Sequence, residues 1–69
     1  MNKATLKKHA RLYRELDALA ASAIKPWDDR RRDLYLDARN AIGSVIREVD
    51  WNLWNDLHKA SLVGTTGKK

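Results

Sequence analysis

The sequence predicts an all-α protein, on the basis of three observations. The 69 residues contain one proline and three glycines, and no alternating β-branched run that would indicate strands. Apolar residues recur at the three- and four-residue spacing of an α-helix. Lys25-Pro26 divides the chain, because proline disfavours helical backbone in the residue before it and has no N–H. We therefore predict a helical hairpin, with one helix over residues 4–24 and a long helix over residues 27–62.

The first predicted helix has an apolar side and a basic side. We expect Asn2 or Thr5 to cap it, because either side chain accepts a hydrogen bond from an unpaired backbone N–H. Its apolar side comprises Leu6, His9, Leu12, Tyr13, Leu16, Leu19, Ala20 and Ala23. Its basic residues are Lys3, Lys7, Lys8, Arg11 and Arg14, and no acidic residue precedes Glu15. The net charge of +5 is therefore local, because it belongs mainly to this helix and to the last two lysines.

The second predicted helix begins at Pro26, which suits a first helical turn. Asp28 and Asp29 then place negative charge beside the positive end of the helix. Its apolar stripe, the predicted core face, comprises Leu34, Tyr35, Ala38, Ala41, Ile42, Val45, Ile46, Val49, Leu53, Leu57 and Ala60.

The two predicted helices differ in length. Residues 5–24 span roughly 30 Å and residues 29–60 roughly 48 Å as continuous helices, so a simple hairpin leaves part of the long stripe without a partner. One solution is a homodimeric helical bundle, in which a second copy covers the stripe; the small size and the lack of disulfides favour it. The alternative is a monomeric three-helix bundle, in which the long helix bends or breaks near Asp50 and Asp50 caps a short third helix.

Length and composition predict a single helical domain over residues 1–63, followed by a flexible tail over residues 64–69. Gly64 suits the end of a helix, because glycine accepts the left-handed conformation found there. The chain contains no cysteine and no apolar run of the roughly 20 residues that span a bilayer. These features predict a cytoplasmic protein without a membrane span.

Enzymatic activity is not expected from this sequence. Cysteine nucleophiles are absent, the serines fall in helical patterns rather than strained turns, and no Ser-His-Asp order occurs. His9 and His58 are far apart and lack the spacing of a zinc-binding helix. We therefore predict no catalytic residue, no cofactor and no metal ligand.

The three tryptophans are the most informative feature, because the chain has no phenylalanine. In a continuous long helix, Trp51 and Trp54 point away from the core, on the side of Leu36, Gly43 and Arg47. Tryptophan beside arginine is typical of interaction hot spots. In the three-helix alternative, a bend at Asp50 turns both tryptophans into the core. The predicted partner-binding residues are Trp51, Trp54, Leu36, Arg47, Arg31 and Tyr35.

These observations predict a small non-enzymatic protein–protein interaction module. It would act as an adaptor, inhibitor or regulator that docks on a larger protein, such as a host protein, as do accessory proteins encoded by phages or plasmids. The alternative is a basic nucleic-acid-binding regulator that uses Lys3, Lys7, Lys8, Arg11 and Arg14 to contact phosphates or an acidic partner. No helix-turn-helix, zinc-finger or basic-zipper pattern supports sequence-specific DNA recognition.

Overall fold

The computed structural model describes residues 1–63, which form three α-helices and one short 3-10 turn without any strand. Helix α1 covers Lys3–Ser22, the 3-10 turn η1 covers Pro26–Asp28, α2 covers Asp29–Val49 and α3 covers Trp51–Lys59. This confirms the all-α prediction and the boundary at the proline. The predicted flexible tail, residues 64–69, lies outside the described residues.

Helix α1 begins and ends at local hydrogen bonds. The Asn2 side chain accepts from the Thr5 backbone N–H at 2.8 Å, so Asn2 is the cap, and Thr5 is already helical. At the other end, the Ser22 hydroxyl donates to the Leu19 carbonyl at 2.8 Å. The chain then turns through extended backbone at Lys25 into η1, as expected for a residue that precedes proline.

The predicted long helix breaks at Asp50, which terminates α2 and starts α3. Its backbone is extended, with φ −150° and ψ 91°. The Asp50 N–H donates to the Ile46 carbonyl at 2.7 Å, while the Asp50 side chain accepts from the Leu53 N–H at 3.1 Å. One residue thus closes one helix and caps the next, and α3 ends at Lys59 rather than at residue 62.

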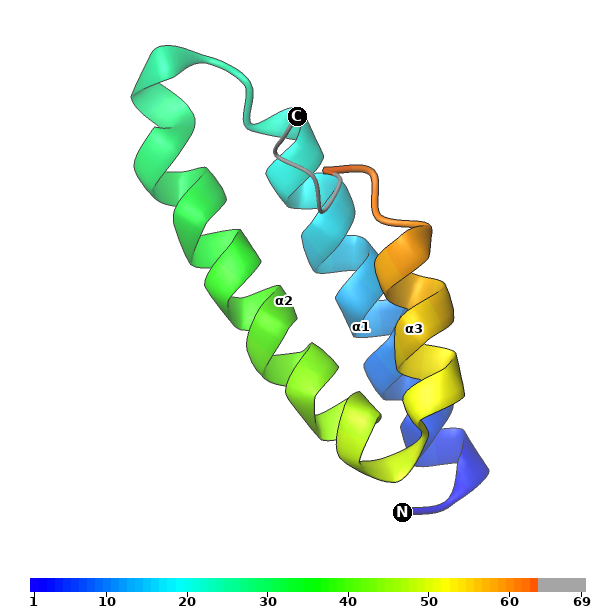
Figure 1. Ribbon diagram of the computed structural model, residues 1–69. Coiled ribbons are helices and arrows are strands. Elements are labelled where there is room, and N and C mark those ends of the chain that lie inside the picture. The colour runs from blue at the N-terminus through cyan, green and yellow to red at the C-terminus, as the bar shows by residue number, and fades with distance from the viewer. Residues whose placement is uncertain (64–69) are drawn as a thin grey trace.

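The helices form an antiparallel α1–α2 hairpin with α3 against one of its faces (Figure 1). Helix α3 turns back from the end of α2 and runs in the direction of α1. The Cα extents of 39 × 22 × 14 Å describe a flat, elongated molecule. Because α3 has nine residues whereas α1 and α2 have 20 and 21, it covers its face of the hairpin over only part of the length.

The hydrophobic core lies where the three helices meet. It consists of the buried side chains Ala10, Tyr13, Ile46 and Leu57. Leu6, Ile42, Leu53 and Trp54 pack around them and are half-buried. Ile46 is fully buried, with 0% of its surface exposed.

The buried side of α2 differs from the predicted stripe. Arg39, Gly43 and Ile46 are its buried residues. Five residues of the predicted stripe are exposed instead: Leu34, Ala38, Ala41, Val45 and Val49. The apolar residues of α2 extend further around the helix than the part that α1 and α3 cover. The predicted stripe therefore continues onto the surface.

Candidate functional site

The first candidate site is an aromatic patch, formed by Trp51, Trp54 and His58 of α3 together with Arg47 of α2. The ring centroids of Trp51 and Trp54 lie 6.1 Å apart with the planes tilted by 50°. Trp54 stacks on His58 at 4.9 Å, and the Arg47 guanidinium lies 5.4 Å from the Trp54 ring centroid. Trp51 remains 55% exposed. The patch therefore presents one accessible tryptophan beside one that is held on several sides.

Gly43 permits this arrangement, because a side chain at this position would meet both neighbouring helices. A Cβ atom on Gly43 would lie 2.9 Å from Tyr13 Cε2 and 3.4 Å from Trp54 Nε1. The first distance is well inside van der Waals contact. The mid-helix glycine thus lets Tyr13 of α1 and Trp54 of α3 pack closely against α2, and it anchors the aromatic patch to the core.

The two tryptophans lie in different environments. Trp54 lies as the three-helix alternative predicts, and Trp51 lies as the continuous long helix predicts. The break at Asp50 brings Trp54 against the core, where it is half-buried. Trp51, the first residue of α3, stays exposed. We therefore expect replacement of Trp54 to affect the fold, whereas Trp51 belongs to the surface.

The other predicted partner-binding residues do not all join this patch. Leu36 and Tyr35 are half-buried near the opposite end of α2. Arg31 is exposed and forms an ion pair with Asp28 at 3.5 Å. Arg31 and Arg47 lie on the same straight helix and are separated by roughly 24 Å along its axis. Of the six predicted residues, the structure brings together Trp51, Trp54 and Arg47.

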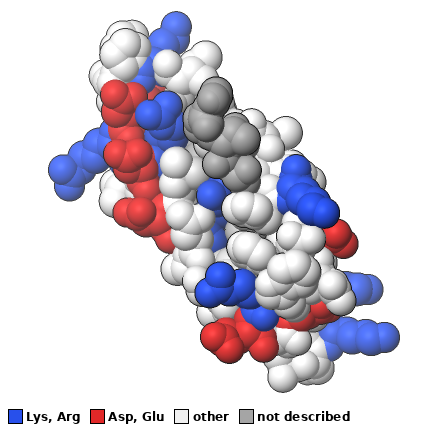
Figure 2. All heavy atoms as spheres, in the orientation of Figure 1, with Lys and Arg blue, Asp and Glu red and all other residues white. Residues whose placement is uncertain are grey.

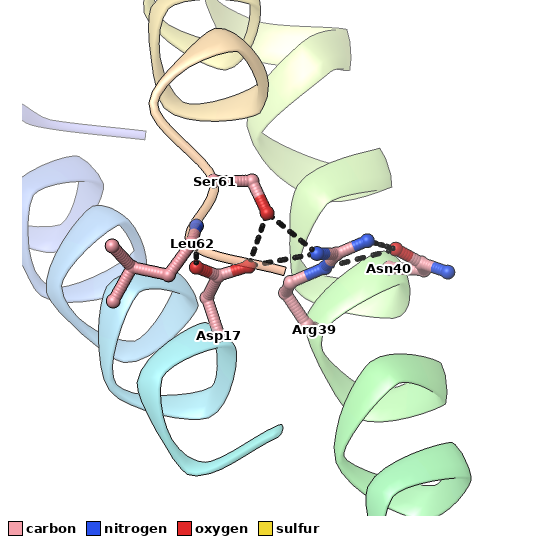
Figure 3. A network of polar contacts seen from close by, with 5 residues as sticks. All are labelled: Asp17, Arg39, Asn40, Ser61 and Leu62. Atoms are coloured by element: carbon pink, nitrogen blue, oxygen red, sulfur yellow. Dashed lines mark hydrogen bonds and ion pairs between the residues drawn. The ribbon is translucent and has the colours of Figure 1, made fainter. Parts of the chain in front are cut away.

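A partly buried polar network ties the segment after α3 to the hairpin (Figure 3). The Asp17 carboxylate of α1 accepts hydrogen bonds from Arg39 Nη1 at 2.8 Å, from the Ser61 hydroxyl at 2.6 Å and from the Leu62 backbone N–H at 2.7 Å. Arg39 also donates from Nε and Nη2 to Asn40 Oδ1, at 3.2 and 2.8 Å. We call these five residues the Asp17 clasp.

The charged pair in the clasp is largely withdrawn from water. The side chains of Arg39 and Asp17 are 9% and 5% exposed, and the Arg39 guanidinium also lies 5.5 Å from the Tyr13 ring centroid. Burial alone raises the pKa of Asp17, but the hydrogen bonds from Ser61, from the Leu62 N–H and from Arg39 outweigh it and hold the pKa below its usual value. Asp17 is therefore an ionised structural anchor whose two oxygens are both engaged.

Sequence reasoning did not identify this network. One signal was present, because Asp17 is an acidic residue on the apolar side of α1, four residues after Tyr13 and three before Ala20. Its partners Arg39 and Ser61 are 22 and 44 residues away, and helical periodicity carries no information at such separations.

The basic residues of α1 are divided between two sides of the helix. Lys3, Lys7 and Arg14 border a groove between α1 and α3. Arg11 points elsewhere and pairs with Glu15 at 3.3 Å, and Lys8 lies about 100° around the helix from Lys7. On the face shown in Figure 2, an uncharged surface over α3 is bordered by charged side chains.

A second apolar surface lies on the side of the hairpin away from α3, and we call it the hairpin face. Leu12 and Leu19 of α1 lie about 140–160° around their helix from Arg14, which borders the α3 groove. Leu34 and Val45 of α2 lie about 140–160° from Arg47, which contacts α3. With Val49, these side chains are between 40% and 57% exposed. The hairpin face thus joins apolar rows from both long helices.

Within residues 1–63, no group of three or more His, Cys, Asp or Glu side chains is placed to hold a metal ion. The same part of the chain contains no helix with the length and apolarity needed to cross a membrane. Comparison of the chain with protein-family models, with curated proteins and with solved structures finds no significant match.

Proposed function

We propose that this protein is a non-enzymatic interaction module that docks on a larger protein through the aromatic patch of α3. The observation that carries the proposal is the exposure of Trp51, at 55%, beside the anchored pair Trp54 and Arg47. This arrangement suits an adaptor or inhibitor of the kind that phages and plasmids encode to act on a host protein.

The physical reason is preorganisation of the contact residues. Tryptophan and arginine dominate protein-interface hot spots, and each buries a large area on binding. Ordering a free side chain at an interface costs about 0.5–1.5 kcal/mol, and the contacts of Trp54 with Gly43 and His58 have already removed much of this cost. An incoming partner therefore meets a patch whose geometry is largely set.

The test is capture of a binding partner by the wild type and by two single-tryptophan variants. Trp51→Ala should abolish capture, while Trp27→Ala is the matched control, because Trp27 is 79% exposed and lies at the other end of α2, in η1. Both variants should retain helical circular dichroism. Loss of the same partner in both variants, or its retention by Trp51→Ala, would contradict the proposal.

We also propose that two copies associate through the hairpin face. Leu34, Ala38, Ala41 and Val45 follow one another at spacings of four, three and four, the pattern of a helix–helix seam. A standard interface needs about 800 Å² per partner, roughly one sixth of the 5002 Å² surface of this protein. The hairpin face spans two helices and is therefore suited to supplying an interface of that area. In a two-fold symmetric dimer, the hairpin face of one copy would contact the hairpin face of the other.

Sedimentation equilibrium tests this association with two neighbouring substitutions. Val45→Lys places a charge in the hairpin face and should convert a dimer to a monomer. Ser44→Lys, one residue away on the polar side of α2, should leave the dimer intact. A monomeric wild type would refute the association without affecting the role of Trp51.

A further inference from the structure

The seam between α1 and α3 contains a groove that neither proposed interface uses. Its first part is lined by Lys3, Leu6, Lys7, Ala10, Arg14 and Leu53. Its second part continues past Tyr13 and Leu57 towards the Asp17 clasp, and Arg14 borders both parts. The groove exists because α3 is short and covers the flank of α1 incompletely.

The first part of the groove, which we call the basic groove, has an apolar floor and a cationic rim. Leu6, Ala10 and Leu53 supply the floor, and Leu6 and Leu53 are half-buried members of the core periphery. The rim consists of Lys3, Lys7 and Arg14. A pocket of this composition matches a ligand that is apolar on one side and negatively charged on the other.

No carboxylate of residues 1–63 forms an ion pair with the rim cations. Among residues 1–63, Lys3, Lys7 and Arg14 form no ion pair, whereas Arg11, Arg31, Arg32 and Arg39 each pair with a carboxylate. The charges of these three side chains are therefore available to an external anion.

We propose that the basic groove binds an acidic amphipathic helix of a partner protein. From Lys3 to Arg14 the rim extends roughly 16 Å along α1, the length of three turns of a partner helix. The partner would place leucine-like side chains on the floor and glutamate or aspartate against the rim, in the helix-in-groove mode of recognition.

The apolar floor distinguishes this occupant from a nucleic acid. A duplex presents phosphates that pair with the rim, but its backbone offers no aliphatic side chain to cover Leu6 and Leu53.

The experiment measures binding of a fluorescently labelled synthetic peptide with leucines along one helical face and glutamates along the other. We expect saturable binding to the wild type, and little binding of a scrambled peptide of equal composition. Lys3→Glu with Lys7→Glu should weaken binding about tenfold, because two favourable charge pairs become repulsive. Glutamate in the first turns of α1 also suits the helix dipole, so this variant should fold.

The matched control is Lys8→Glu with Arg11→Glu, which changes the net charge by the same amount outside the groove. It should alter peptide affinity less than about twofold. Equal losses in the two double variants, equal binding of the scrambled peptide, or no peptide binding by the wild type would each overturn the proposal. If the wild type binds a DNA duplex more tightly than the peptide, and both double variants weaken duplex binding equally, these residues belong to a nucleic-acid-binding surface instead.

This proposal is independent of the docking role of Trp51. His58 and Trp54 of the aromatic patch are absent from the groove lining, so Trp51→Ala should leave peptide affinity unchanged. If the protein binds the peptide but captures no partner through Trp51, the groove proposal stands and the docking role of Trp51 fails. If it captures a partner through Trp51 but does not bind the peptide, the docking role stands and the groove proposal fails.

Discussion

Replacing Asp17 with alanine should remove a large part of the stability of this protein. The substitution deletes the acceptor of three hydrogen bonds and leaves the Arg39 guanidinium, 9% exposed, without a counter-charge. Breaking a buried ion pair in this way costs about 3–5 kcal/mol. A chain of this length has a free energy of unfolding of about 3–10 kcal/mol in total, from the usual value per residue. The substitution should therefore remove between about a third and all of this free energy at neutral pH.

Urea unfolding followed by circular dichroism measures this change, and Glu15→Ala provides the control. Glu15 pairs with Arg11 on the same helix, but the two side chains are 60% and 82% exposed, so its loss should cost at most about 1 kcal/mol. If Asp17→Ala is no more destabilising than Glu15→Ala, the Asp17 clasp does not contribute as its geometry indicates.

The same network gives a pH dependence with a defined sign. The pKa of Asp17 is lower in the folded protein than its usual value, so the unfolded chain binds its proton first as the pH falls. The stabilisation is therefore complete above the ordinary aspartate pKa of about 3.9 and is lost as the pH falls below it, through the folded pKa. Asp17→Asn should reduce the acid-dependent loss of unfolding free energy. An unchanged slope in this variant would show that other carboxylates cause it.

Four further substitutions test the core and the helix boundaries. Gly43→Ala should destabilise the protein in urea unfolding, because the clash with the buried Tyr13 ring at 2.9 Å outweighs the gain of about 1 kcal/mol in helix propensity; a stabilised variant would refute this. Asp50→Ala should cost about 1 kcal/mol through loss of the α3 cap, measured in the same way. Ile46→Val should cost about 0.5–1.5 kcal/mol, because the side chain is fully buried; a change near zero would contradict that burial. Tyr13→Phe should reduce the loss of stability at alkaline pH, because burial raises the pKa of Tyr13 above its ordinary value. The charge of Arg39 lowers this pKa and the charge of Asp17 raises it, and the net direction is upward. The unfolded tyrosine then ionises first as the pH rises above about 10.

The helices and their boundaries were predictable because local chemistry determines them. Asn2, Pro26 and Asp50 act on backbone groups within a few residues, and the structure places helix boundaries at or beside each of them. The break at Asp50 was one of two alternatives. It depends on the hydrogen bond that the Leu53 N–H donates to the Asp50 side chain, and periodicity alone does not decide between a cap and a continuous helix.

The arrangement of the site was less predictable because it depends on packing between helices. The sequence pattern indicated that Trp51 and Trp54 are candidate partner-binding residues. Their different environments depend on the direction in which α3 leaves Asp50, which the pattern does not report. The role of Gly43 was only partly visible, since the sequence pattern placed it on the side of Trp54 but did not indicate its close contact with Tyr13. The Asp17 clasp joins three segments that are distant in the chain, so no local pattern reports it.

Helix α3 has only nine residues, fewer than the roughly 12–15 that an isolated helix needs to persist in water. It is secured at its start by the Asp50 cap and beyond its end by Asp17. Its amides should consequently exchange with solvent deuterium as one unit, through an opening that requires less free energy than global unfolding. The α1–α2 hairpin would remain protected during that opening. In dynamic terms, Asp17 sets how often the third helix detaches and exposes Tyr13 beneath it.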